Sequence, residues 1–208
     1  MTNYWHFAAI NKNGKPVMRD GTLIEVGKRY EIDGEPVLCE YGYHGSILAI
    51  DALKYAPGAW ISQRPLEGVI EGDDKVVGNA FVQQQGADAT EVLHEFARLC
   101  ALDVVRLWDA PQIVVDYLKT GDDSLRDEAC GAAMSAAWGA EMGAARSAAC
   151  YAVCCAERSV ACGASRYVAW DLELDASSDD AKAKARENQN KRLEKMLLEL
   201  LKKKEGLQ

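Results

Sequence analysis

The stretch DATEVLHEFARLCALDVVRLW, residues 88–108, marks the point at which the residue pattern of the chain changes. Apolar residues recur in it at spacings of three and four, which is the period of an α-helix with one buried face. The apolar positions are Val92, Leu93, Phe96, Leu99, Cys100, Val104 and Leu107. Either Asp88 or Thr90 can cap the first turn. This stretch therefore predicts an amphipathic helix, and the segments on its two sides differ in kind.

The residues before this helix are typical of short strands. Four segments are rich in β-branched and aromatic residues, and turn signals such as Asn13-Gly14 and Asp33-Gly34 separate them. The segments are YWHFAAI, TLIEVGKRYEI, PVLCEYGYH and PLEGVI. One helix, ILAIDALKYA, is expected among them, with Ser46 as its cap and Pro57-Gly58 as its end. We therefore expect a β-rich α+β domain over residues 1–85.

The residues after Gly86 predict helices. QIVVDYLK forms a short helix after Pro111, and Asp122-Asp123-Ser124 caps another helix that starts at Leu125. Residues 131–170 consist of ten groups of four, most with two or three small residues and one larger one. Small side chains allow neighbouring helices to approach closely. We therefore expect an Ala-rich helical bundle over residues 86–208, and an α+β class for the whole chain.

A basic helix is expected over residues 181–205. RLEKMLLELLKKK places leucines on one side and lysines at the C-terminal end, where they suit the helix dipole. Two arrangements stay open for it: the helix docks back on the bundle, or it pairs with another copy to form a homodimer.

Charge is spread unevenly along the chain, whose formal net charge is -8. It is -3 over residues 1–86, -10 over 87–180 and +5 over 181–208. An acidic body repels phosphate backbones and attracts basic protein surfaces, so we expect no direct nucleic-acid binding by the main body. The expected partner is a bacterial protein complex, and complexes that themselves bind nucleic acid are among the candidates. The residues predicted to contact it are Asp122, Asp123, Asp127 and Glu128.

The chain carries no signal for secretion or for a membrane. The opening residues MTNYWHFAAINKNGK lack the order of a signal peptide, and no apolar run reaches the roughly 18 residues of a membrane span. We therefore expect a cytoplasmic protein in the bacterial host cell.

The seven cysteines do not form the pattern of a disulfide framework. Five of them lie in or beside the small-residue segment, where a cysteine behaves as a compact apolar residue. Cys150, Cys154 and Cys155 are the alternative metal ligands, but no histidine lies nearby and the paired spacing of a zinc site is missing. We expect neither a metal nor a cofactor.

One constellation outside the helices could bind a ligand. CEYGYHGS, residues 39–46, places Tyr43, His44 and Ser46 around two glycines just before the predicted helix. Backbone amides at such a junction can hold an anion, and a histidine can carry a proton near neutral pH. The alternative is a turn whose aromatic side chains fold onto the sheet. Both interpretations stay open at this point.

Several segments together resemble a group of uncharacterised proteins from bacteriophages and integrated mobile elements. They are VGKRY, CEYGYHGS, ALKYAPG, GDDKVV, PQIVVDYLKTGDDSLRDEA, the Ala-Ala tetrads and NQNKRLEKMLLELL. The resemblance covers nearly the whole chain and implies an accessory protein that acts inside bacteria. By analogy with anti-CRISPR proteins, such a protein would be an inhibitor of a host defence complex.

A second set of residues is similar in order to that of ADP-ribosyltransferases. His6 lies in a first strand, Tyr43 precedes a helix with the ending ALKYA, and Glu67 or Glu71 follows in a later strand. The similarity implies that His6 and Tyr43 hold NAD and that the glutamate stabilises a cationic transition state.

Three functions are therefore carried forward. The first is a non-enzymatic phage or mobile-element accessory protein that inhibits a CRISPR-Cas or other defence complex through an acidic surface. The alternatives are an NAD-using transferase and a self-assembling structural protein.

Overall fold

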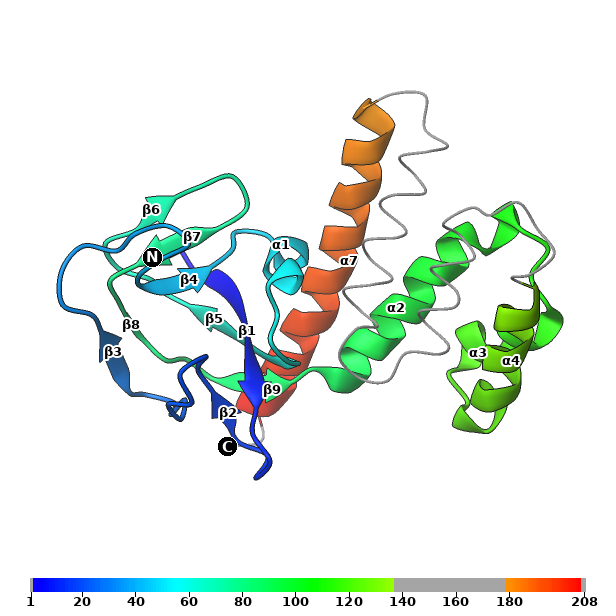
Figure 1. Cartoon of the computed structure of the whole chain (residues 1–208), viewed down its shortest axis with the longest axis horizontal. Helices are drawn as coiled ribbons and strands as arrows, with labels where there is room; N and C mark the ends of the chain where they lie inside the picture. Colours follow the sequence, from blue (N-terminus) through cyan, green and yellow to red (C-terminus); the bar gives the residue numbers. More distant parts are fainter. Residues whose placement is uncertain (1, 137–178, 207–208) are drawn as a thin grey trace. The chain divides into compact units, whose positions relative to one another are not determined.

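The structure, a computed structural model of the chain, describes residues 2–136 and 179–206 (Figure 1). It contains both helices and antiparallel sheets, so the chain is α+β. It divides into two compact units: residues 1–89 with 193–208, and residues 90–192. The last helix thus contributes to both units, whereas we expected residues 181–205 to belong with the helical part alone. Residues 137–170 of the tetrad segment lie outside the described residues.

The first unit is built from three small antiparallel sheets. The largest has the strand order β2-β1-β5-β9. Its strands are β1 (Tyr4–Ile10), β2 (Pro16–Val17), β5 (Trp60–Arg64) and β9 (Gly86–Asp88). The other sheets pair β3 (Arg29–Glu31) with β8 (Ala80–Val82), and β4 (Tyr43–Gly45) with β7 (Val76–Gly78) and β6 (Ile70–Glu71).

The register of β1 on β5 decides which side chains share a face of the main sheet. Tyr4 pairs with Arg64, and His6 pairs with Ser62. Directly paired residues point to the same side, and successive residues alternate. His6 and Arg64 therefore lie on one face. Phe7 and Ile61 lie on the other, where both are buried in the core.

Helix α1 (Ala49–Lys54) is capped differently from our prediction. Its N-cap is Leu48, which supplies no side-chain bond, while the backbone of Ser46 pairs with that of Trp5. The cap comes from the far end of the chain: a Glu194 carboxylate oxygen accepts hydrogen bonds from the Ala49 N–H (3.4 Å) and from the indole N–H of Trp5 (3.2 Å). A partly buried carboxylate at this position satisfies one of the donors that a helix start leaves unpaired.

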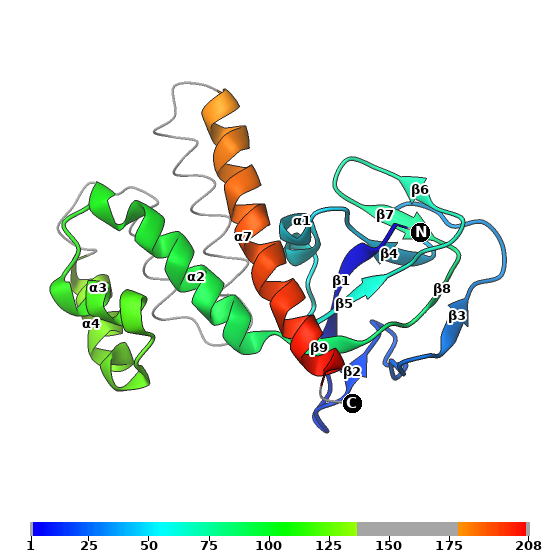
Figure 2. The same ribbon diagram turned by 180° about the vertical axis from the view of Figure 1, so that it is seen from behind.

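Helix α7 (Asp179–Glu205) supplies that glutamate. Leu193, Leu197 and Leu201 are buried along its C-terminal half, and this half lies beside α1 in both views (Figure 2). Within the described residues, the C-terminal half therefore docks on the β-rich part. We had expected the helix to dock on the bundle or on a second copy.

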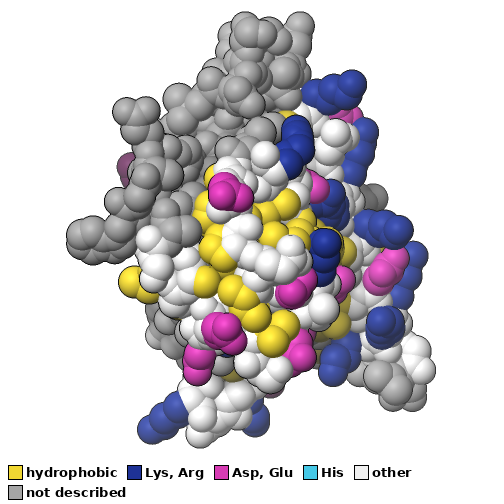
Figure 3. All heavy atoms as spheres, turned by 90° about the vertical axis from the view of Figure 1, so that its right-hand side faces the viewer, with side chains coloured by type: hydrophobic (Ala, Val, Ile, Leu, Met, Phe, Trp, Pro, Cys, Tyr) yellow, Lys and Arg dark blue, Asp and Glu magenta, His cyan; other side chains and the backbone are white. Residues whose placement is uncertain are grey.

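The second unit is helical over its described residues. It contains α2 (Thr90–Val104), the short η1 (Val105–Leu107), α3 (Gln112–Thr120), η2 (Asp123–Leu125), α4 (Arg126–Ala136) and the start of α7. The predicted helix over 88–108 is confirmed as α2 and η1. A core of small and apolar residues joins α2, α3 and α4: Ala97, Ala101, Val114, Tyr117, Leu118, Ala129 and Ala133. On the face that carries α3 and α4, apolar side chains gather, and both acidic and basic side chains lie around them (Figure 3).

Candidate functional site

A cavity of about 630 Å³ lies in the first unit. Its lining comes from β1, β3, β4 and β5, from the turn around residues 17–22 and from the segment 39–46. The three predicted ligand-site residues, Tyr43, His44 and Ser46, all line it. The structure thus brings together the residues that the CEYGYHGS pattern singled out, and it adds two that the pattern did not indicate, His6 and Arg64.

Arg64 is the most unusual residue of this cavity. Its side chain is buried at 2% exposure, and among the described residues its Nε and one terminal nitrogen, Nη2, have no hydrogen-bonding partner. Within the described residues its close contact is the ring of Phe81, whose centroid lies 4.5 Å from the guanidinium carbon. Burial lowers the pKa of Arg64 to about 9, so the group is still a cation at neutral pH. A buried cation without a carboxylate is costly, because nothing replaces the water it has lost.

His6 lies on the same face of the sheet, two residue pairs along from Arg64. Burial, and secondly the charge of Arg64, hold the pKa of His6 well below 6.5, so the ring is neutral at pH 7. The Ser62 hydroxyl across from it is buried and has no partner in the part of the chain that the structure describes. Within residues 2–136 and 179–206, this sheet face therefore carries three polar atoms without partners, Arg64 Nε, Arg64 Nη2 and Ser62 Oγ.

His44 holds the loop that forms one wall of the cavity. Its Nε2 accepts a hydrogen bond from the Cys39 N–H at 3.0 Å, so this nitrogen carries no proton. Burial also lowers the pKa of His44. Cys39 has a φ of 67°, a left-handed conformation that is uncommon for a residue other than glycine. The bond to His44 thus stabilises a strained turn, and this Nε2 is not free to relay protons.

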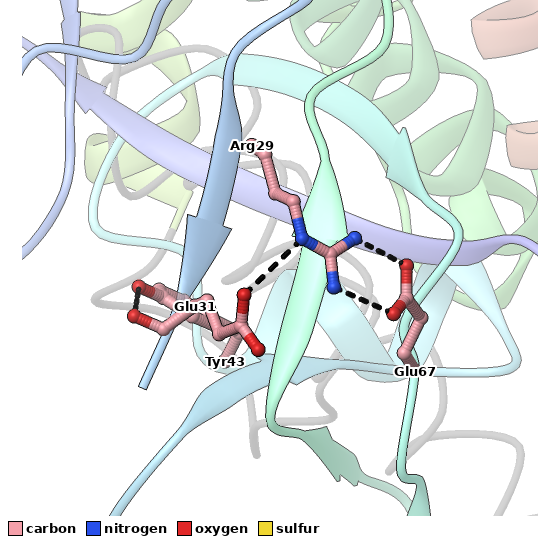
Figure 4. Close-up of polar contacts among 4 residues, drawn as sticks. All are labelled: Arg29, Glu31, Tyr43 and Glu67. Carbon is pink, nitrogen blue, oxygen red and sulfur yellow. Dashed lines mark hydrogen bonds and ion pairs between the residues drawn. The ribbon is translucent and has the colours of Figure 1, made fainter. Parts of the chain in front are cut away.

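Tyr43 belongs to an aromatic cluster as well as to the cavity. Its ring packs edge-on against Phe81 at 4.9 Å and against Tyr30 at 6.4 Å, and burial raises its pKa. Its hydroxyl donates to the backbone carbonyl of Glu31 at 3.5 Å (Figure 4). The two interpretations of this tyrosine therefore coexist, since the ring folds onto the sheet and also lines the cavity.

The glutamates singled out by the ADP-ribosyltransferase similarity lie elsewhere. Glu67 forms a two-pronged ion pair with Arg29, with N–O distances of 2.7 and 2.8 Å, and Arg29 lowers its pKa (Figure 4). Among the described residues that line the cavity, the carboxylates are Asp20 and Glu40, and neither Glu67 nor Glu71 is present. The structure brings His6 and Tyr43 to one cavity but not the third residue of that arrangement.

The four acidic residues predicted to contact a partner are all exposed at the start of α4 and the turn before it. Asp122 is the N-cap of η2, where its side chain accepts a bond from the Ser124 N–H at 2.9 Å, as the sequence predicted. Asp123 lies in the first turn of η2, and Asp127 and Glu128 lie in the first turn of α4. Negative charge there stabilises the helix starts. Contact with a bacterial complex stays a prediction.

The cysteines differ in part from expectation. Cys130 is disulfide-bonded, although the cysteine spacing did not predict a disulfide. The alternative metal ligands, Cys150, Cys154 and Cys155, lie outside the described residues. Over residues 2–136 and 179–206, no group of three histidine, cysteine or acidic side chains could hold a metal ion. Over the same ranges, no helix has the length and apolar content needed to span a membrane.

Comparison with known proteins adds no relative. No protein-family model, no curated protein and no solved structure matches the chain. The chemistry of the cavity is therefore the basis for a function.

Proposed function

We propose that the first unit is a binding module for a small anionic ligand, with Arg64 as the residue that neutralises the ligand's charge. The observation behind the proposal is the buried guanidinium that has two nitrogens without partners in the wall of a cavity. Buried charges in proteins are normally paired or hydrogen-bonded. An anion in the cavity would neutralise the charge of this guanidinium.

The other charges of the cavity support the same ligand class. Its lining includes Arg19, Arg64 and Lys75 against Asp20 and Glu40, which leaves one net positive charge. The unit as a whole is acidic, with 12 lysines and arginines against 15 aspartates and glutamates over residues 1–89 and 193–208. A positive cavity in an acidic surface concentrates anions at one place.

Neither acidic side chain of the cavity pairs with Arg64 as an anionic ligand would. Asp20 accepts a hydrogen bond from the Thr22 N–H at 2.9 Å, and bonds to Thr22 lower its pKa. Glu40 is exposed. No ion pair joins either carboxylate to Arg64 in the part of the chain that the structure describes. The volume also fits, since small-molecule pockets measure about 300 to 1,000 Å³.

The test is a calorimetric titration of the protein with inorganic phosphate, pyrophosphate and sulfate. We expect saturable binding of at least one anion, and a loss of at least tenfold in affinity in Arg64→Met. Hydrogen bonds to a charged group contribute about 1.5 to 3 kcal/mol, which corresponds to that range. Arg29→Met is the matched control, because it removes an exposed guanidinium of the same unit that does not line the cavity.

Two results would contradict the proposal. One is the absence of binding by all three anions. The other is equal loss of affinity in the Arg64 and Arg29 variants, which would indicate a general effect of net charge.

A further inference from the structure

The cavity has an aromatic side as well as a cationic one. Six aromatic residues line it: Trp5, Phe7, Tyr30, Tyr41, Tyr43 and Tyr55. Four of them are mostly buried among other protein side chains. Tyr41 and Tyr55 differ, because 46% and 44% of their surfaces are exposed.

Tyr55 is held in place although it is exposed. Its hydroxyl donates to Asp74 Oδ2 at 2.8 Å, and this bond is the main reason that its pKa is raised. The ammonium of Lys75 lies 3.7 Å from the centre of its ring. A cation in this position covers one face of the ring.

Tyr41 is held in a similar way. Its hydroxyl donates to the backbone carbonyl of Asp33 at 3.2 Å. Its backbone N–H donates to the Val37 carbonyl at 2.9 Å, and its own carbonyl accepts from the Val37 N–H at 2.7 Å. Both rings are therefore ordered before any ligand arrives, and a planar group that stacks on them loses little side-chain entropy.

From this combination we infer that the anionic ligand is a nucleoside monophosphate. The inference rests on the proposed function: the phosphate binds at Arg64, and the base stacks on Tyr41 or Tyr55. Asp20 and Glu40, the two carboxylates of the lining, are acceptors for ribose hydroxyls or base amino groups. One buried arginine in the cavity wall matches the charge of one phosphate group.

A comparison of three ligands separates this inference from the proposed function. Inorganic phosphate, ribose 5-phosphate and AMP share the phosphate and differ in the ribose and the base. Stacking of a base on an aromatic side chain contributes about 1 to 3 kcal/mol, so we expect AMP to bind about 5 to 150 times more tightly than ribose 5-phosphate. Guanosine, cytidine and uridine monophosphates extend the series to the other bases.

Variants of the two tyrosines locate the base. In the variant that lacks the stacking tyrosine, either Tyr41→Leu or Tyr55→Leu, we expect the affinity for AMP to fall to that for ribose 5-phosphate. The double variant should show the same loss. The affinity for inorganic phosphate should be unchanged in all three. Tyr41→Phe and Tyr55→Phe keep the ring and should keep most of the affinity for AMP. Circular dichroism and the melting temperature establish that each variant is folded.

Each outcome has a defined meaning. If AMP binds no better than ribose 5-phosphate, the nucleotide inference is overturned and the anion module stands. If AMP gains affinity but the double leucine variant keeps that gain, the placement of the base is wrong and the inference fails. If no phosphate compound binds, the proposed function fails together with it.

Discussion

Replacement of Arg64 by methionine should stabilise the ligand-free protein. The drop of its pKa from 12.5 to about 9 corresponds to about 5 kcal/mol of unfavourable free energy for the buried cation, at about 1.4 kcal/mol per pKa unit. The contact with the Phe81 ring returns about 2 kcal/mol of this. Methionine keeps an apolar stem in the same space. We therefore expect a net gain of about 3 kcal/mol, within the range of about 1 to 4 kcal/mol found when buried ionic groups are replaced by apolar ones.

The assay is thermal unfolding of wild type and Arg64→Met in buffer without phosphate or sulfate. A gain of about 3 kcal/mol raises the melting temperature of a chain of this size by about 6 to 12 °C. Arg29→Met should shift it little, because Arg29 is exposed. Saturating ligand should reverse the order, since it stabilises the wild type and not the variant.

The pH dependence gives an independent check. Below pH 9 the folded and unfolded states both hold the Arg64 proton, and the full cost of burial is present. Above pH 9 the folded state releases the proton while the unfolded state, with a pKa of 12.5, keeps it, so the wild type gains stability relative to Arg64→Met. The difference between the two proteins should shrink from pH 8 to 10.5. Two results together would contradict the cost assigned to the buried Arg64 cation: an Arg64→Met variant that melts several degrees below the wild type, and a difference in melting temperature that stays constant over this pH range.

Three further predictions concern the surroundings of the cavity. Glu194→Ala should lower the free energy of unfolding by about 1 to 2 kcal/mol in urea titrations, because the Ala49 and Trp5 N–H groups both lose their acceptor, whereas Glu199→Ala should have little effect. Glu67→Gln should leave the titrated phosphate affinity unchanged, since Glu67 pairs with Arg29 outside the cavity; loss of binding would place Glu67 in the site. Urea titrations should show the free energy of unfolding falling as the pH drops below 6.5, because His6 is protonated in the unfolded chain and stays neutral in the folded state. The decline should be weaker in His6→Gln. An unchanged decline would contradict the assignment of a lowered pKa to His6.

Local patterns were sufficient to predict much of the secondary structure. The apolar spacing over 88–108 predicted α2, and the Thr120-Gly121 stop predicted the end of α3, where Gly121 has a φ of 66°. Such features depend on residues within one or two helical turns of each other. The grouping of Tyr43, His44 and Ser46 at one cavity was predictable for the same reason, since they are neighbours in the chain.

The decisive site residue could not be found in this way. Whether Arg64 faces inward or outward depends on the register of β5 on β1, about sixty residues earlier in the chain. The available signal was the alternation in WISQR, which places Ser62 and Arg64 on the same face of the strand as Trp60. Trp60 is buried in the structure. That signal says which residues go together, but it does not say that the shared face is the inner one.

The cap of α1 was missed for a related reason. The sequence offered Ser46, a good capping residue close to the helix start, but its backbone is engaged with Trp5 in a bridge. Glu194 lies 145 residues from the Ala49 N–H to which it bonds, and no local rule links the two. The spacing of the leucines in α7 predicted an apolar face on this helix. Which surface covers that face depends on the tertiary structure, so local sequence patterns could not predict it.

The most direct test of the central claim is to observe the Arg64 side chain itself during a titration with inorganic phosphate. The Nε–H signal of Arg64 in a nitrogen-15 NMR spectrum can be assigned by its absence in Arg64→Met. We expect this signal to move downfield and to saturate as phosphate binds, while the Nε–H signal of Arg29 does not follow the same curve. An Arg64 signal that stays in place at phosphate concentrations that saturate the protein by calorimetry would contradict this expectation.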